Sequence, residues 1–248
     1  MFSTDPVLIL GGTTEAAALA RKLAAEGLSV ITSLAGRTRD PAPLPGETRI
    51  GGFGGVEGLA SYLRDNQIAV LVDATHPFAA QMSANAVVAA AKAGIPRLRL
   101  ERPAWEPRAD DSWIEVADEE AAAAALPSGA RAFLALGSQH LAPFAKRDDV
   151  HFVLRMVDAP QSAPALASHE IVLGLPGDIE SETALLRGRR ITHLVCRNSG
   201  GEASYAKIIA ARDLKIPVIM IRRPAEPVPP VAETVEEAIA FIGSVLSA

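Results

Sequence analysis

Cysteine is nearly absent from the sequence: Cys196 is the one such residue among 248. A single thiol cannot form a disulfide within the chain or supply a cysteine-based zinc site, so both are excluded. Long hydrophobic runs are also missing, since no stretch approaches the roughly 18 apolar residues that a membrane span needs. The first residues, MFSTDPVLILGG, include no basic segment and only a short apolar run, so a secretory leader is not expected.

Basic charge is in short supply as well. The chain has 24 Lys and Arg against 29 Asp and Glu, which gives a formal net charge of −5. This balance disfavours general binding to nucleic acid or to anionic membranes, although a local basic patch is compatible with it. We therefore expect a cytoplasmic protein that binds neither nucleic acid nor membrane and holds no metal. The hydrophobic content of 49% allows a real core, in one large domain or two small ones.

Short apolar runs alternate with helix-forming segments along most of the chain, and this alternation predicts parallel βαβ units. The exception is ERPAWEPRADD at 101–111, which lacks periodicity and resembles a linker. The predicted fold class is α/β, with two Rossmann-like halves that are each a parallel sheet flanked by helices, and with an active-site crevice between them. The expected domains are residues 1–100 and residues 112–248.

Two local patterns refine this prediction. AGIPRLRLERP at 93–103 is similar to LKIPVIMIRRP at 214–224, which a duplication of two related halves explains most simply. Coincidence is the alternative, because proline before an edge strand is common. Near the end, Thr234 and Glu237 form a T-x-x-E pattern that predicts the N-cap of a last helix. A further helix is predicted over HLAPFAKR at 140–147.

A glycine-rich turn follows the first predicted strand. In LILGGTTEA, Gly11, Gly12, Thr13 and Thr14 stand between this strand and the helix after it. Glycines let a ligand approach the main chain closely, and the N–H groups at the start of a helix attract an anion such as a pyrophosphate. The segment lacks the full G-x-G-x-x-G fingerprint, so a purely structural turn is the alternative.

The end of the second predicted strand favours NADP over NAD. NAD sites carry an acid about 20 residues after the glycines, but ITSLAGRTRD offers Ser33, Arg37 and Thr38 and has no acid before Asp40. Hydroxyls and cations suit a 2′-phosphate, although surface arginines in a solvated loop would look the same. The turn GGFGG at 51–55 follows the third strand and lies at the same edge of the sheet.

The segment DATHPFA at 73–79 places unusual chemistry after another predicted strand. Pro77 suits the first position of a helix and keeps His76 out of the helical region, which projects His76 and Thr75 from the sheet edge. His76 and Asp73 are candidate acids, while bound water is a rival proton source. A capping or packing role for the histidine is the alternative.

The second half supplies groups that suit carboxylates. Predicted strands end in GSQ at 137–139 and in RNSGG at 197–201, Arg155 lies on a third, and Lys207 follows in a helix. Arginine can grip a carboxylate with two hydrogen bonds, and glycine N–H groups can add donors. A capped turn with surface charges is the alternative for RNSGG.

These motifs together resemble a known family. GGTTEA, DATHPFA, ERPAW, GSQ, CRNSGG with Lys207, and IPVIMIRRP are similar, across nearly the whole chain, to the precorrin-6A reductases of cobalamin biosynthesis. The resemblance implies an NADPH-dependent reduction of precorrin-6A to precorrin-6B. A hydride would go to one carbon of a conjugated C=N/C=C system and a proton to its neighbour, with the tetrapyrrole between two Rossmann-like halves.

The resemblance and the motifs assign the candidate residues by position. The expected cofactor-binding residues are Gly11, Gly12, Thr13, Thr14, Glu15, Ser33, Arg37, Thr38, Gly52, Phe53 and Thr75. The expected substrate-binding residues are His76, Pro77, Phe78, Ser138, Gln139, Arg155, Arg197, Asn198, Ser199, Gly200, Gly201 and Lys207. The candidate catalytic residues are His76 and Asp73.

Two other functions stay open at this point. An NADP-dependent reductase of another anionic small molecule would explain the first half equally well but not the second-half motifs. A sensor that binds NADP(H) without turnover would not need the polar groups of the second half. A monomer is expected, because two halves would already enclose the substrate. Whether that substrate contains cobalt is open.

Overall fold

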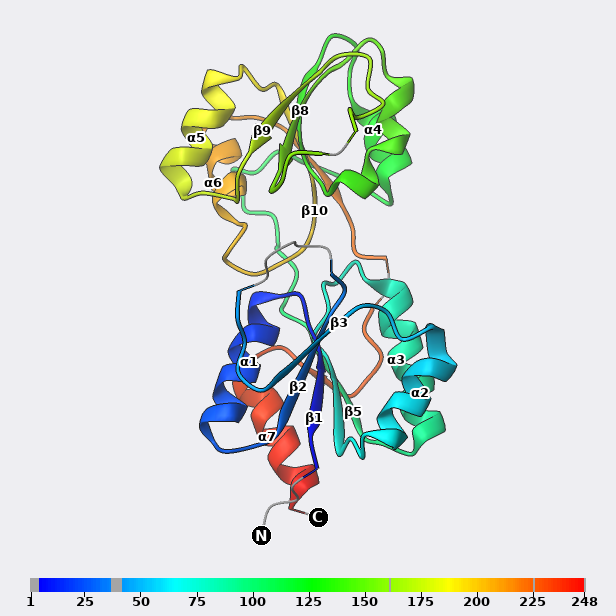
Figure 1. Cartoon of the computed structure of the whole chain (residues 1–248). Coiled ribbons are helices and arrows are strands. Elements are labelled where there is room, and N and C mark those ends of the chain that lie inside the picture. Colours follow the sequence, from blue (N-terminus) through cyan, green and yellow to red (C-terminus); the bar gives the residue numbers. More distant parts are fainter. Residues whose placement is uncertain (1–4, 37–41, 161, 225, 248) are drawn as a thin grey trace. The chain divides into compact units, whose positions relative to one another are not determined.

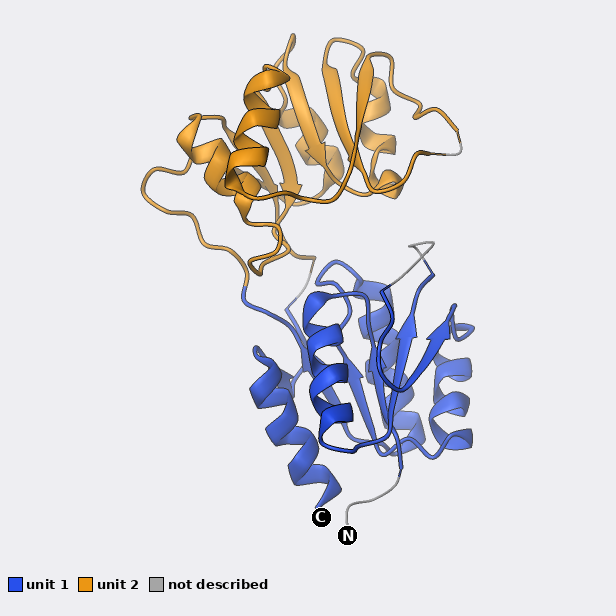
Figure 2. Cartoon of the chain, turned by 60° about the vertical axis from the view of Figure 1, so that its left-hand side comes forward, with its two compact units in different colours: residues 1–103, 225–248 blue, residues 104–224 orange. Residues whose placement is uncertain are grey.

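The chain forms two compact units in the computed structural model, which describes residues 5–36, 42–160, 162–224 and 226–247. Unit 1 comprises residues 1–103 and 225–248, and unit 2 comprises residues 104–224 (Figure 2). The expected second domain of 112–248 is therefore too long, because the last helix belongs to unit 1. That helix, α7 (Val235–Leu246), buries Ala238 and Ile242 in the core of unit 1.

Unit 1 is built on a six-stranded parallel sheet. In spatial order its strands are β3 (Glu47–Ile50), β2 (Val30–Leu34), β1 (Val7–Leu10), β4 (Val70–Asp73), β5 (Arg97–Leu100) and β12 (Val231–Ala232). Helices α1 (Thr14–Ala25) and α7 cover one face, and α2 (Gly55–Asp65) and α3 (Ala80–Ala93) cover the other (Figure 1). Thr234 caps α7 as predicted, because its hydroxyl accepts from the N–H of Glu237 at 3.2 Å.

Unit 2 repeats this architecture. Its strands, in spatial order, are β9 (His169–Leu173), β8 (His151–Met156), β7 (Arg131–Ala135), β10 (His193–Arg197), β11 (Val218–Ile221) and β6 (Trp113–Val116), all parallel. Its helices are α4 (Glu119–Ala125), α5 (Ile179–Gly188) and α6 (Ala206–Asp213). The helix predicted over 140–147 is instead two 3₁₀ turns, at Ser138–His140 and Ala142–Lys146. Pro143 has no N–H group to continue an α-helix there.

The strand order explains the similar segments of the two halves. Five strands of each sheet follow the 3-2-1-4-5 order of a doubly wound fold, and β5 and β11, which carry the two similar segments, are the fifth of these strands. The sixth strands depart from a simple tandem arrangement. β6 precedes the other five strands of its sheet in the chain, whereas β12 returns to unit 1 after the whole of unit 2. The topology favours the duplication interpretation.

This order also fixes where ligands are expected. In a doubly wound sheet the order reverses between the first and fourth strands, and ligands bind beyond the carboxyl ends of those strands. In unit 1 this point lies between β1 and β4, where Leu10 is paired with Asp73. In unit 2 it lies between β7 and β10, where Ala135 is paired with Cys196. The strongest sequence motifs of each half follow these strands directly. Among the described residues, no helix is long and apolar enough to cross a membrane.

The single thiol is expected to be unreactive in the folded protein. Cys196 is buried in β10, its Sγ lies 3.8 Å from Sδ of Met220, and burial raises its pKa to about 11. Near neutral pH the group is therefore a protonated thiol, which is a poor nucleophile. Labelling with a thiol-reactive dye should be slow in the native protein and rapid after unfolding in guanidinium. Equal rates in the two states would contradict the buried position.

Candidate active site

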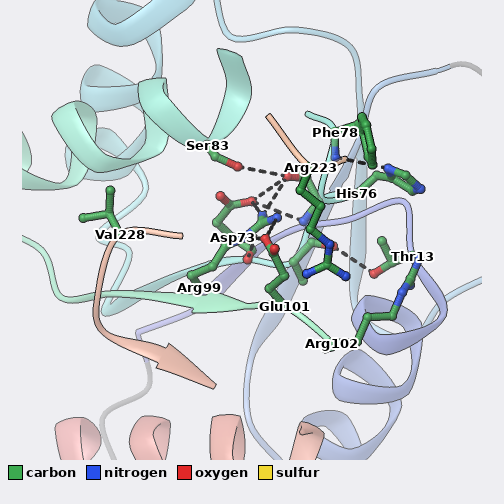
Figure 3. A network of polar contacts seen from close by, with 12 residues as sticks. Thr13, Asp73, His76, Phe78, Ser83, Arg99, Glu101, Arg102, Arg223 and Val228 are labelled. Atoms are coloured by element: carbon green, nitrogen blue, oxygen red, sulfur yellow. Dashed lines mark hydrogen bonds and ion pairs between the residues drawn. The ribbon is translucent and has the colours of Figure 1, made fainter. Parts of the chain in front are cut away.

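The glycine turn of unit 1 joins β1 to α1. Gly12 has φ +114°, a backbone conformation that favours glycine. Thr13 is the N-cap of α1: its hydroxyl accepts from the N–H of Ala16 at 3.1 Å and donates to the carbonyl of Ala74 at 2.8 Å. The Thr13 side chain therefore ties the turn to the end of β4 (Figure 3). The main-chain N–H groups of the first turn of α1 are the hydrogen-bond donors that this loop has for an anion.

The space around these glycines fits a bulky phosphate ligand. A Cβ added at Gly12 would meet no atom within 4 Å, and the same is true at Gly51, Gly52, Gly54 and Gly55. The turns are thus open above the main chain, as close approach of a pyrophosphate requires. Glu15, which would repel a phosphate, is paired with Arg102. Its other described contact is the hydroxyl of Thr14, which donates to Oε2 at 3.1 Å.

The edge of the sheet next to this turn carries a cation that the sequence motifs did not single out. Arg49, in β3, lies beside Ser33 in the register of the sheet, with Nη1 3.4 Å from the Ser33 hydroxyl. Its guanidinium lies 3.8 Å from the ring centroid of Phe53. Two of the predicted cofactor-binding residues, Arg37 and Thr38, lie outside the described residues. Arg49 could have been found from its place two residues before GGFGG.

The segment 73–79 forms a tight turn before α3 rather than the start of a helix. The N–H of Ala79 donates to the carbonyl of His76 at 2.7 Å, which closes a β-turn with Pro77 at its second position. Helix α3 begins at Ala80, so the prediction that Pro77 is the first helical residue is wrong. Nδ1 of His76 accepts from the N–H of Phe78 at 3.3 Å, and the two rings lie 5.8 Å apart.

A buried polar network lies next to this turn (Figure 3). Asp73 is fully buried, and Oδ1 lies 2.8 Å from Nη1 of Arg99 and 2.7 Å from the hydroxyl of Thr75. Arg99 also donates to the Thr75 hydroxyl at 3.0 Å and is paired with Glu101. Arg99 and Glu101 were not among the predicted site residues. Because Asp73 is fully buried and its Oδ1 is held by Arg99 and Thr75, the geometry favours a positioning role for this carboxylate.

The RNSGG turn of unit 2 is held by Trp105. The Asn198 side chain accepts from the N–H of Trp105 and donates to its carbonyl, both at 2.8 Å. The indole N–H donates to the carbonyl of Gly201 at 2.8 Å. Lys207 is buried, with Nζ 4.9 Å from the Trp105 ring. Trp105 and the RNSGG turn are therefore one structural unit, in which Asn198 shapes the turn.

Two arginines of unit 2 have well-defined partners. Arg197 at the end of β10 donates from Nη1 toward Nε2 of His140 at 2.9 Å, and His140 is bound through Nδ1 to Glu119 at 2.9 Å. This chain of contacts orients the Arg197 guanidinium, and its other members were not predicted. Arg155 forms a two-point ion pair with the buried Glu182, with both N–O distances at 2.8 Å. Arg155 is therefore less suited to gripping a substrate carboxylate than the sequence suggests.

One of the substrate candidates that follow β7, Ser138, lines an open pocket. Ser138 lines a pocket of about 500 Å³ beyond the carboxyl ends of β7 and β8, together with Leu141, Met156 and Pro160. Gln139 follows Ser138 in the same 3₁₀ turn and is exposed. The lining combines apolar side chains with a few hydroxyls, as in small-molecule sites generally.

Fold and site together define a protein of two Rossmann-like units, each with polar turns at its topological switch point. Residues 6–243 match the family described as precorrin-6x reductase CbiJ/CobK, and the chain belongs to that family. This finding confirms the resemblance drawn from the motifs. The precorrin-6A reductase of Rhodobacter capsulatus is 47% identical over 238 residues, which cover 95% of each chain.

Two further relatives extend the comparison. The cobalt-precorrin-6A reductase of Priestia megaterium is 30% identical over 248 residues, covering 94% of this chain and 96% of that protein. A solved structure of CobK precorrin-6A reductase has a TM-score of 0.93 and 46% sequence identity, and the match covers 97% of this chain and 96% of that one. The two-unit architecture described above is thus the family's own.

Proposed function

We propose that this protein reduces precorrin-6A to precorrin-6B in cobalamin biosynthesis, with NADPH as the hydride donor. The observation that carries the proposal is the match to the precorrin-6x reductase family over residues 6–243. Identity is 47% to a relative named for precorrin-6A and 30% to one named for the cobalt complex. This difference favours the metal-free macrocycle as the substrate.

The cofactor would bind at the glycine turns of unit 1. The open main chain at Gly12 and the first turn of α1 would hold the pyrophosphate, and Gly52 with Phe53 would border the adenosine. When bound, NADPH supplies the hydride. The chain's contribution is to place the cofactor against the acceptor carbon and to exclude competing chemistry.

The polar groups of unit 2 would hold the carboxylates of the macrocycle. Arg197 is the best-placed candidate, because the contact with His140 fixes the direction of its guanidinium. The main-chain groups around Gly200 and Gly201, both at positive φ, belong to the turn that Trp105 stabilises. A fixed guanidinium beside backbone donors suits recognition of a carboxylate.

His76 is the residue of unit 1 that best fits a donor to the substrate. Because Nδ1 accepts from the N–H of Phe78, the neutral ring carries its proton on Nε2. The buried network of Asp73, Thr75 and Arg99 would keep the His76 turn in place. In this role the Nε2–H of the neutral His76 ring would donate a hydrogen bond to the substrate. Donation of a proton at the carbon next to the hydride acceptor would require the imidazolium form, in which Nδ1 no longer accepts from Phe78, and bound water competes for this step.

Replacing His76 by alanine is expected to lower kcat/KM by about 10²–10⁴ if the ring is the proton donor. The melting temperature should change little, because the side chain is only partly buried. The measurement is steady-state kinetics under anaerobic conditions, with a melting curve as control. Unchanged kinetics would exclude any role of His76 in turnover or substrate binding.

The proposed reaction is tested by following NADPH absorbance and the macrocycle spectrum when precorrin-6A is added without oxygen. NADPH should be consumed only in the presence of the tetrapyrrole, and far more slowly with cobalt-precorrin-6A. Binding of NADPH without turnover of either macrocycle would support a sensor instead. Turnover of cobalt-precorrin-6A alone would instead identify the cobalt complex as the substrate.

A further inference from the structure

The carboxyl edge of unit 1 contains a cation beside the predicted ribose position. The register of the sheet pairs Leu10 of β1 with Ser33 of β2, and it pairs Ser33 with Arg49 of β3. Gly11 follows Leu10, and its N–H donates to the carbonyl of Ser33 at 2.8 Å. Arg49 therefore belongs to the same sheet edge as the glycine turn, two strands away from it.

The contacts of Arg49 fix the position and orientation of its guanidinium group. Nη1 donates to the carbonyl of Gly51 and Nη2 to that of Gly52, both at 2.6 Å. One face of the guanidinium packs on the ring of Phe53, and the Tyr62 ring centroid lies 5.3 Å away. A guanidinium held in this way loses little conformational entropy when it binds a ligand, which favours a recognition role.

The charge and donors of Arg49 are incompletely satisfied. Within the described part of the chain no carboxylate lies within 4.0 Å of it, whereas Arg99 has two such partners and Arg102 and Arg155 have one each. Its three hydrogen bonds, to Gly51, Gly52 and more weakly to Ser33, use three of the five N–H donors of a guanidinium. A half-buried cation with donors to spare is suited to an anionic ligand.

We propose that Arg49 binds the 2′-phosphate of the adenosine ribose and makes the protein prefer NADPH to NADH, an inference that rests on the proposed function. In doubly wound folds, an acid at the end of the second strand binds the ribose 2′-hydroxyl of NAD, and an arginine nearby accommodates the 2′-phosphate of NADP. Here Ser33 and Arg49 occupy the strand ends at which doubly wound folds distinguish NADP from NAD.

The experiment compares dissociation constants of NADPH and NADH for the full chain and for Arg49→Met. Loss of charge-assisted hydrogen bonds should weaken NADPH binding by about 10- to 100-fold and NADH binding by less than about threefold. The fragments adenosine 2′,5′-bisphosphate and adenosine 5′-monophosphate should show the same contrast. Arg64→Met is the matched control, because Arg64 is an exposed residue at the end of α2 whose described side-chain contact is Ser61. It should change neither constant.

Each outcome decides the proposal. Equal weakening of NADPH and NADH in Arg49→Met would show that Arg49 only shapes the turn, and no change would remove it from the site; both overturn the inference. If the methionine variant does not fold, Arg49→Lys decides, since it keeps the charge and loses the planar fork. This variant must also weaken NADPH more than NADH. Failure of the unaltered protein to bind either dinucleotide would instead overturn the proposed function itself.

Discussion

Replacing Arg99 by methionine should lower the free energy of unfolding by about 3–5 kcal/mol. Arg99 is 2% exposed and is paired with two buried carboxylates, those of Asp73 and Glu101. Methionine fills much of the same volume but leaves both carboxylates buried without their cation. The cost comes from those unpaired charges rather than from lost packing. Urea unfolding followed by circular dichroism measures it.

Two further variants show whether burial is the cause. Lys92→Met removes an ion pair with Glu57 that is largely exposed, and it should cost no more than about 1 kcal/mol. The triple variant Arg99→Met, Asp73→Asn, Glu101→Gln should recover part of the loss, because the uncompensated charges are gone. A cost for Arg99→Met as small as that for Lys92→Met would mean that the network does not hold unit 1 together.

Replacing Gly12 by alanine should weaken NADPH binding by about 10- to 100-fold, a loss of roughly 1.4–2.8 kcal/mol. The added methyl group meets no protein atom within 4 Å, so it does not clash within the fold. It would instead occupy the space through which a pyrophosphate approaches the main chain. Titration of the variant with NADPH, followed by the quenching of protein fluorescence, gives the ratio of dissociation constants.

Gly27→Ala is the matched control for this variant. Gly27 also has positive φ, at +80°, and an added Cβ there also meets no atom within 4 Å, but it lies at the other end of α1. Both substitutions should cost roughly 1–2 kcal/mol of stability, since alanine is strained in this conformation. Only Gly12→Ala should weaken NADPH binding. Equal NADPH affinities of the two variants would mean that the cofactor does not bind at the glycine turn.

The alternation of strands and helices was enough to predict the fold class, because the apolar runs between the helices are strands of two parallel sheets, whose inner strands are largely buried. It was not enough to predict where the last residues go. β12 is two residues long and has no periodicity to detect, and α7 is amphipathic in a way that would suit either sheet. Its assignment to unit 1 depends on packing of Ala238 and Ile242 against α1 and the strands.

The motifs predicted the location of the candidate site better than the role of each side chain. DATHPFA and CRNSGG do follow the strands at the switch points, since strand ends and turn residues are local properties of the sequence. Which side chains pair is not local. The partners of Asp73 and Asn198 are Arg99 and Trp105, which come from distant segments. The contact of Arg49 with Ser33 is equally non-local, because only the register of β2 and β3 brings the two residues together.

The central claim, that the protein transfers a hydride from NADPH to the macrocycle, is tested most directly with NADPH carrying deuterium at both C4 positions. Precorrin-6B formed without oxygen in ordinary water should contain one deuterium atom by mass spectrometry, whichever face of the nicotinamide is used. The same reaction with unlabelled NADPH in heavy water reports the hydrogen that solvent supplies at the neighbouring carbon, which is detected as incorporated deuterium. Reduced product without deuterium from labelled NADPH would contradict direct transfer and with it the proposed arrangement of the site.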